Sequence, residues 1–172
     1  SLRVSPGRSI HDAAAGTENG EVEYDVPGTS AFAITASGRT YGNLTLTRTA
    51  GAATYSAAGG SALTIRGNFK LNTGVTFSST MTGAMNLQGN LQNGGTITPT
   101  AGQAWFFNGS AAQSVTGATT LVNVTLNNAN GLSLNNDLTV NGTLTLTAGR
   151  ITTGANKVAM GGAGTVPGAG ST

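Results

Sequence analysis

Apolar residues recur at a nearly constant interval along the second half of this sequence. The same interval separates Trp105 from Val124, Phe107 from Leu126, Val124 from Leu144, Leu126 from Leu146, Leu132 from Ile151, Leu138 from Val158, and Val140 from Met160. A constant interval of this kind is typical of a coiling chain, in which each turn stacks its apolar side chains on the turn below. The spacing therefore predicts an all-β fold, a parallel β-solenoid with about 20 residues per turn.

The segments between the corners of the coil are too short and too rich in β-branched residues for helices. From Val124 to Met160, stretches such as "LTV" and "TLTL" are separated by corners such as "NND", "NG" and "GAN". Apolar residues alternate with Thr and Asn, which is the period of a half-buried strand. Gly and Asn at the corners supply left-handed backbone and local hydrogen bonds. We expect three short strands per turn, with Asn and Thr side chains hydrogen-bonded from turn to turn.

Two features leave part of the fold open. An antiparallel β-sandwich also has short strands and frequent turns, although it need not keep a constant interval. In addition, residues 62–74 resemble residues 137–149 at a shift of 75, and residues 42–47 resemble residues 122–127 at a shift of 80. The difference between these shifts predicts a longer loop within residues 48–60. The assignment of strands to turns stays open over residues 44–100.

The chain carries unusually little charge. Charged residues make up 8% of the 172 residues, the net charge is +2 and cysteine is absent, whereas about 25% of an average globular protein is charged. The cations beyond residue 30 are dispersed along the sequence: Arg39, Arg48, Arg66, Lys70, Arg150 and Lys157. Nucleic-acid binding needs clustered cations and is not expected. Disulfides and thiolate metal sites are excluded, and no apolar run reaches the length of about 18 residues that a membrane span needs.

The acidic residues divide the chain into two parts, because a single one, Asp137, follows residue 30. We predict that residues 1–30 form a cap or a partner-pairing segment and that residues 31–172 form the solenoid. If "EVEYDV" is a strand, successive side chains point to opposite faces, so the acidic residues lie on one face and the apolar residues on the other. The candidates for pairing with another subunit are Glu21, Val22, Glu23, Tyr24, Asp25 and Val26. The alternatives are a charged edge that blocks pairing and a calcium site.

The segment "FFNGSAAQSVTGATTLVNVTLNNANGLSLNNDLTVNGTLTLTAGRITTG" (106–154) resembles repeat segments of very large secreted surface proteins of Gram-negative bacteria. These segments are similar to those of filamentous-haemagglutinin-type adhesins. The resemblance implies a right-handed β-helix, a location outside the cell or on its surface, and a role as stalk, adhesin or surface layer. It transfers no catalytic residue, and residues 1–30 lie outside it.

A search for catalytic groups argues against an enzyme. Right-handed β-helices also host polysaccharide lyases and hydrolases, and glycoside hydrolysis typically needs two facing carboxylates. Over residues 26–172 the sequence has one carboxylate, Asp137 in "NNDL", where Asp ordinarily supports a turn. His11 and Asp12 are adjacent, so a strand would point them to opposite faces. We expect no enzymatic activity and predict no catalytic, cofactor or metal site.

The one cluster of aromatic residues is "AWFF" (104–107). The constant interval requires Trp105 and Phe107 to point into the core, so Phe106 points outward. An exposed aromatic ring can stack on a sugar or meet a partner, which makes Phe106 the candidate glycan or partner contact. The alternative is an isolated surface residue of the ordinary kind.

Outward threonines suggest one further alternative. Thr64, Thr125 and Thr145 are expected at equivalent outward positions of different turns, where a flat hydroxyl lattice that binds ice is conceivable. Lys70 and Phe106 are expected at equivalent positions and would interrupt such a lattice. Function rests on the site and not on the fold, so this alternative ranks below a structural role.

The sequence therefore predicts a non-enzymatic extracellular structural protein of a bacterium: a β-solenoid stalk or adhesin segment, or a self-assembling fibre subunit. Its expected partners are copies of itself, joined head to tail, and surface glycans. A carbohydrate-binding β-helix module is the alternative, and an atypical polysaccharide lyase ranks behind it.

Overall fold

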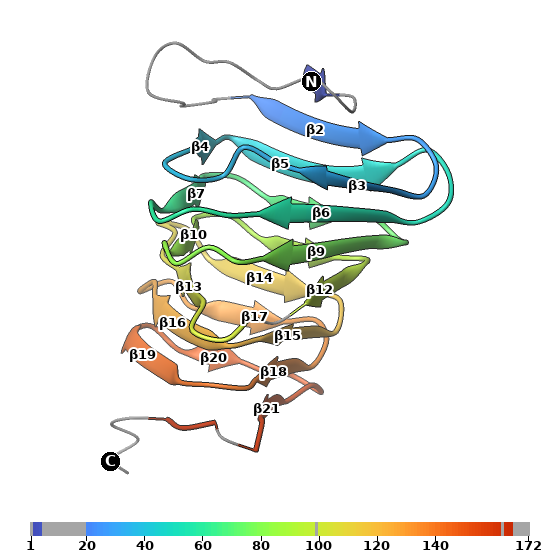
Figure 1. Cartoon of the computed structure of the whole chain (residues 1–172). Coiled ribbons are helices and arrows are strands. Elements are labelled where there is room, and N and C mark those ends of the chain that lie inside the picture. Colours follow the sequence, from blue (N-terminus) through green and yellow to red (C-terminus); the bar gives the residue numbers. More distant parts are fainter. Residues whose placement is uncertain (1, 5–19, 99, 163, 167–172) are drawn as a thin grey trace, which may run out of the picture.

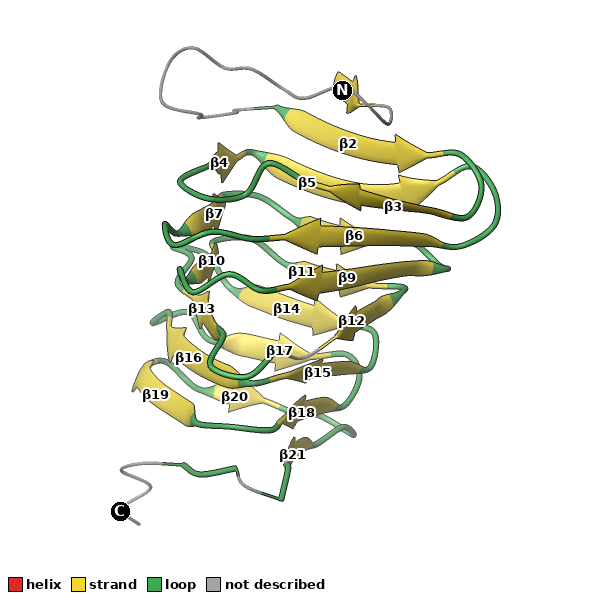
Figure 2. Cartoon of the chain, in the orientation of Figure 1, coloured by secondary structure: helices red, strands yellow, loops and turns green. Residues whose placement is uncertain are grey.

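The structure is a computed structural model that describes residues 2–4, 20–98, 100–162 and 164–166. These residues form short strands and loops without a helix. The strands pair in parallel and stack as a β-solenoid of about six turns, about 22 residues apart (Figures 1 and 2). The predicted all-β parallel solenoid is confirmed.

Four parallel sheets build the sides of the coil. Sheet A contains, in spatial order, β1 (Leu2–Val4), β2 (Glu21–Val26), β5 (Asn43–Arg48), β8 (Phe69–Leu71), β11 (Leu91–Asn93), β14 (Gln113–Thr116), β17 (Leu132–Leu134) and β20 (Ile151–Thr152). Sheet B contains β19 (Leu144–Ala148), β16 (Asn123–Asn127), β13 (Ala104–Phe107), β10 (Met85–Leu87), β7 (Leu63–Ile65) and β4 (Thr40–Tyr41). Sheet C contains β12 (Thr96–Thr98), β9 (Val75–Ser79), β6 (Ala53–Ala57) and β3 (Ser30–Ala33), and sheet D contains β15 (Thr119–Leu121), β18 (Leu138–Val140) and β21 (Val158–Met160). Sheet D continues the side begun by sheet C, because β12 contacts β15 (Figure 1).

The register in the second half agrees with the intervals found in the sequence. All of the apolar pairs are direct neighbours on adjacent strands: Trp105 and Val124, Phe107 and Leu126, Val124 and Leu144, Leu126 and Leu146, Leu132 and Ile151, Leu138 and Val158, and Val140 and Met160. A one-residue slip would move every apolar side chain to the wrong face. The alternation of apolar and polar residues therefore sets the register.

The turns of the first half are longer than expected. Val22 pairs with Leu44, and Leu44 pairs with Phe69, so both turns exceed the interval of the second half. The prediction of a longer loop within residues 48–60 was wrong, because this stretch contains β6 with Tyr55 buried at its centre. The strand is hidden in the sequence by the small residues on either side of that tyrosine.

The internal sequence repeat connects strands that lie on different sides of the coil. Residues 62–74 contain β7 of sheet B and β8 of sheet A, whereas residues 137–149 contain β18 of sheet D and β19 of sheet B. Both stretches are a strand, a corner and a second strand. Corners of the same local geometry favour the same sequence wherever they occur in the coil. The number of residues between these two stretches is therefore not the length of a whole number of turns.

Large apolar side chains fill the interior in continuous columns. Phe69, Phe77 and Trp105 are 0–1% exposed and pack ring to ring, with centroids 5.2 Å apart for Phe69 and Phe77 and 6.4 Å apart for Phe69 and Trp105. Burying a side chain of this kind contributes about 1.5–3 kcal/mol. The core therefore runs along the axis of the coil and holds successive turns together.

Asparagines form a ladder at the corner where the chain enters sheet A. The Oδ1 atom of Asn43 accepts the backbone N–H of Asn68 at 2.8 Å, and that of Asn68 accepts the N–H of Asn90 at 3.1 Å. Asn90 in turn accepts the N–H of Ser114 at 2.8 Å. Each asparagine satisfies a backbone donor of the next turn, so the expected turn-to-turn bonding of polar side chains is confirmed at this corner.

A cluster of buried tyrosines fills the first two turns. Tyr55 is 0% exposed, and its hydroxyl donates to the carbonyl oxygens of Tyr24 at 2.8 Å and Thr47 at 2.6 Å in a shared bond. Burial raises the pKa of the Tyr55 hydroxyl above its usual range, and the carboxylates of Asp25 and Glu23 raise the pKa further. The fold therefore holds this hydroxyl in its neutral form.

This pKa predicts a loss of stability at alkaline pH. The unfolded chain releases the tyrosine proton near pH 10, so the stability that Tyr55 contributes is fully present below that pH and is lost as the pH rises above it. The Tyr55→Phe variant cannot ionise at this position. Its free energy of unfolding at neutral pH is expected to be about 1–3 kcal/mol lower, because the two carbonyl oxygens that accept from the hydroxyl lose their donor. Urea denaturation of both proteins at rising pH is expected to show this difference shrinking above pH ~10. A constant difference would contradict the assignment.

Candidate functional site

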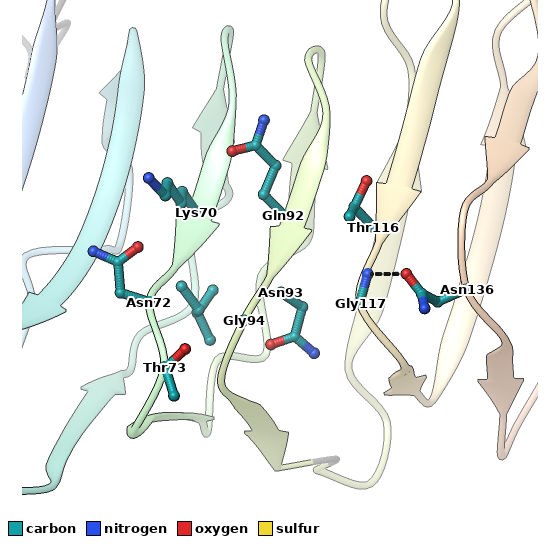
Figure 3. Close-up of a pocket in the computed structure, with 10 residues that line it drawn as sticks. Lys70, Asn72, Thr73, Gln92, Asn93, Gly94, Thr116, Gly117 and Asn136 are labelled. Carbon is teal, nitrogen blue, oxygen red and sulfur yellow. Dashed lines mark hydrogen bonds between the residues drawn. The ribbon is translucent and has the colours of Figure 1, made fainter.

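A groove lined mainly by amide and hydroxyl side chains runs across the outer face of sheet A, parallel to the axis of the coil. It consists of two hollows, of about 240 and 380 Å³, which share Lys70 and Gln92. Figure 3 shows the residues that line the larger hollow. The smaller hollow is also lined by Glu21, Asn43, Thr45 and Asn68. The larger is also lined by Leu71, Asn72, Thr73, Asn93, Gly94, Thr116, Gly117 and Asn136. These residues define the sheet A groove.

Parallel pairing brings the central residues of the groove together. Lys70 on β8 lies opposite Gln92 on β11, which lies opposite Thr116 on β14. Lys70 lies between the buried residues Phe69 and Leu71 of its short strand. Since alternate residues of a strand point to opposite faces, anchoring those neighbours in the core sends Lys70 into solvent.

Hydrogen bonds hold the walls of the groove. Asn136 accepts the backbone N–H of Gly117 at 2.7 Å, and Thr45 donates to Glu21 Oε1 at 2.9 Å. The Asn72 amide donates to the Thr47 hydroxyl at 2.8 Å. The walls are therefore pre-formed by contacts between turns and need no ligand to order them.

The centre of the groove presents donors that the protein leaves unused. Within the part of the chain that the structure describes, the Lys70 ammonium and the Gln92 amide have no hydrogen-bond or ion-pair partner. The Nδ2 group of Asn136 is likewise unengaged there, because the bond of that side chain to Gly117 uses its oxygen. This arrangement suits a ligand that accepts several hydrogen bonds.

The charge along the groove is uneven. On the strands of sheet A from β8 to β20, as far as the structure describes them, Lys70 is the single charged residue. Glu21 lines the opposite end, on β2. One cation is therefore set among amides and hydroxyls, with a carboxylate at one end. The sequence did not identify Lys70 as a site residue, because its groove neighbours come from other turns.

Phe106, the candidate glycan contact, lies on a different side of the molecule. It is half-buried on the outer face of sheet B, between Asn86 of β10 and Thr125 of β16. Its neighbours Trp105 and Phe107 are buried, as expected. Phe106 lines neither hollow of the sheet A groove, and its role as a contact stays a prediction.

The expected row of outward threonines also lies on sheet B. Thr64, Thr125 and Thr145 share one row with Phe106, which interrupts it. Lys70 was wrongly placed in that row, because β8 belongs to sheet A. A further hydroxyl array lies on the outer face of sheet C, with Thr54, Thr76 and Thr96 in one column and Ser56, Ser78 and Thr98 in the next.

Asp137 supports a corner, in agreement with its predicted role. Its Oδ1 atom accepts the backbone N–H of Lys157 one turn on, at 3.0 Å, and its Oδ2 atom lies 3.6 Å from the Lys157 ammonium. The side chains of Lys157 and Asp137 are 72% and 47% exposed. Solvent screens such a pair, so it contributes little to stability, and the backbone bond is the structural contact.

The acidic segment forms β2, and its alternation agrees with the sequence. Val22, Tyr24 and Val26 are buried, whereas Glu21, Glu23 and Asp25 face outward. Both edges of β2 are already paired within the chain, with β1 and with β5. Pairing of these six residues with another subunit stays a prediction, and it would use the carboxylate face.

The separate N-terminal segment predicted for residues 1–30 is described only at residues 2–4 and 20–30, where β1 and β2 belong to sheet A. His11 and Asp12 lie outside the described residues. Among the residues that the structure describes, no group of three or more His, Cys, Asp or Glu side chains could hold a metal ion, and no helix has the length and hydropathy to cross a bilayer.

Comparison of the chain with protein-family models, with curated proteins and with solved structures gives no match.

Proposed function

We propose that the protein is a non-enzymatic structural element of a bacterial surface: a β-solenoid stalk or adhesin segment, or a self-assembling fibre subunit. The observation that carries this proposal is the bonding of each turn to the next, by core columns and by the asparagine ladder from Asn43 to Ser114. A coil whose successive turns are bonded in this way is stiff. Such a coil provides an extended spacer that can transmit force, and it places few constraints on the identity of its surface residues.

The last described turn supports extension of the coil by another layer. β19, β20 and β21 are the final strands of sheets B, A and D, and among the described residues only the beginning of β19 is already covered, by a parallel bridge between Thr143 and Thr165. Leu146 on β19 is 49% exposed, whereas its partner one turn below, Leu126, is 0% exposed. Edge strands with exposed apolar residues pair with further strands. A head-to-tail contact with a second copy buries Leu146 and, because it does not close, grows a filament.

Leu146→Lys is expected to abolish this self-association. A charge on the inward side of an edge strand opposes pairing. The matched control is Thr145→Lys, which adds the same charge to the outward face of the same strand. Light scattering at rising concentration is expected to show increasing mass for the parent protein and for Thr145→Lys, and constant mass for Leu146→Lys. A parent protein that stays monomeric at every concentration would rule out the fibre subunit.

Location tests the surface role separately. Immunogold electron microscopy of the cells that produce the protein is expected to place the label on the outer surface or on fibres that leave it. Label confined to the cell interior would contradict both the stalk and the adhesin version.

A further inference from the structure

The sheet A groove is elongated and open. Its lining residues come from β2, β5, β8, β11, β14 and the corner after β17. Neighbouring strands lie about 4.8 Å apart, so these six levels span about 24 Å. Sites for compact small molecules are concave and enclose most of the ligand. A shallow, straight groove of this length instead fits an extended chain that lies along the axis of the coil.

The wall chemistry selects a ligand rich in hydroxyl groups. Most lining side chains are amides and hydroxyls. Gly94 and Gly117 line the larger hollow with backbone atoms alone. The one large apolar side chain that is exposed in the described chain, Leu146, lies on sheet B and not in the groove. The groove therefore offers hydrogen bonds to polar groups, and in the larger hollow the aliphatic parts of the lining side chains add apolar surface of the kind that the C–H face of a sugar ring can contact.

The charges favour a ligand that places one negative group at Lys70 and neutral groups on either side of it. The Lys70 ammonium is unpaired among the described residues and has the charge and the donors to bind one carboxylate or sulfate. Towards β2 the Glu21 carboxylate repels a second anion, and towards Asn136 the groove supplies neutral donors. A nucleic acid, with a phosphate at every residue, needs many more cations than one.

We propose that the sheet A groove binds an acidic polysaccharide in which charged and neutral sugars alternate, with one acidic group on Lys70. Gln92 and Asn136 donate to the oxygens of the flanking sugars. This binding is independent of the proposed mechanical role, since a stiff coil needs no ligand. It is also distinct from a contact at Phe106, which lies on sheet B.

Titration of the full chain with oligosaccharides of equal length tests the proposal. The probes are hyaluronan and unsulfated chondroitin, which alternate a uronate with a neutral N-acetylated sugar, oligogalacturonate, which is charged at every residue, and neutral maltooligosaccharide. Nuclear magnetic resonance reports both affinity and place. At least one alternating probe is expected to bind more tightly than the other two classes and to shift the side-chain amide signals of Gln92 and Asn136.

Lys70→Gln is expected to weaken that binding by about tenfold or more, because a hydrogen bond to a charged group contributes about 1.5–3 kcal/mol. Lys70 is exposed, so this variant is expected to fold. The matched control is Arg150→Gln, which removes the same charge from an exposed corner outside the groove and is expected to bind as the parent does. Phe106→Ala is also expected to bind as the parent does.

Four results would overturn the proposal. The first is that no probe binds. The second is that oligogalacturonate binds most tightly. In the third, Lys70→Gln and Arg150→Gln weaken binding equally, which would mean unspecific attraction to net charge. In the fourth, binding is lost in Phe106→Ala and retained in Lys70→Gln, which would place the glycan on sheet B.

Discussion

Phe69→Ala is expected to lower the free energy of unfolding by about 3–5 kcal/mol. Phe69 is fully buried, packs edge to face on Phe77 at 5.2 Å and stacks on Trp105 at 6.4 Å. It also lies between Leu44 and Leu91 in its column. The backbone ladders above and below keep the turns apart, so the cavity cannot collapse. Chemical denaturation followed by the fluorescence of Trp105, the one tryptophan, measures the loss.

Phe106→Ala is the matched control for this substitution. It removes the same side chain from the outward face of β13, where the ring is half-buried. The expected loss is about 1 kcal/mol or less, the ordinary range for surface substitutions. Equal losses for the two variants would mean that inward and outward positions are wrongly assigned.

Gly117→Ala is expected to cost about 3 kcal/mol or more, because two penalties combine. Gly117 has a φ of +89°, where an L-residue is strained, and a Cβ atom there would lie 1.8 Å from the carbonyl oxygen of Asn93. Asn93 belongs to the neighbouring strand β11, whose backbone is fixed by the sheet. The substitution therefore forces adjacent turns apart. Denaturation midpoints and thermal melting measure the effect.

Gly102→Ala separates the two penalties. Gly102 has a similar φ of +81°, but a Cβ atom there meets nothing within 4 Å. Its substitution is expected to cost about 1–2 kcal/mol, the strain of the left-handed backbone alone. Equal losses of stability in Gly117→Ala and Gly102→Ala would contradict the close approach of the turns at Gly117.

The second half of the fold was predictable because its turns are regular. From Trp105 onward successive turns have nearly the same length, so the apolar interval in the sequence is the register of the sheets. Asn123 begins β16 and Asn141 follows β18, so asparagines mark the corners that lead into sheet B. Where turns have constant length, the interval between two residues in the sequence predicts whether they are neighbours in space.

The first half was not predictable in the same detail. Its turns vary in length, and β6 presents Ala53 and Ala57 to the core instead of large residues. Small inward residues give a weak alternation signal. They fit there because Tyr55 fills the interior between them and contacts Tyr24 and Phe32.

The groove could not be predicted from the sequence either. Lys70 and Gln92 are distant in the sequence and are recognised as neighbours only when the length of that particular turn is known. The single feature in the sequence that could have identified the site is the exposed cation in an otherwise uncharged series of strands. That feature indicates a site only after Lys70 is placed on the same sheet as Glu21.

The corner Asn141–Gly142 distinguishes the coil from its main alternative. An Asn-Gly pair flanked by alternating apolar residues is the strongest short-range signal for an antiparallel hairpin. In the structure the backbone N–H groups of Asn141 and Gly142 instead donate to the carbonyl oxygens of Leu121 and Val122, one turn earlier, both at 2.9 Å. The chain turns here from sheet D into sheet B.

Disulfide formation between two introduced cysteines tests the coil most directly, because the chain has no cysteine of its own. Thr120 and Thr139 are direct neighbours on β15 and β18, at the spacing of about 4.8 Å that adjacent strands share and that a disulfide can bridge. The coil predicts that cysteines at 120 and 139 cross-link on mild oxidation, and that cysteines at 139 and 144 do not. Cross-linking of 139 to 144 without cross-linking of 120 to 139 is the result for a hairpin and would contradict the solenoid.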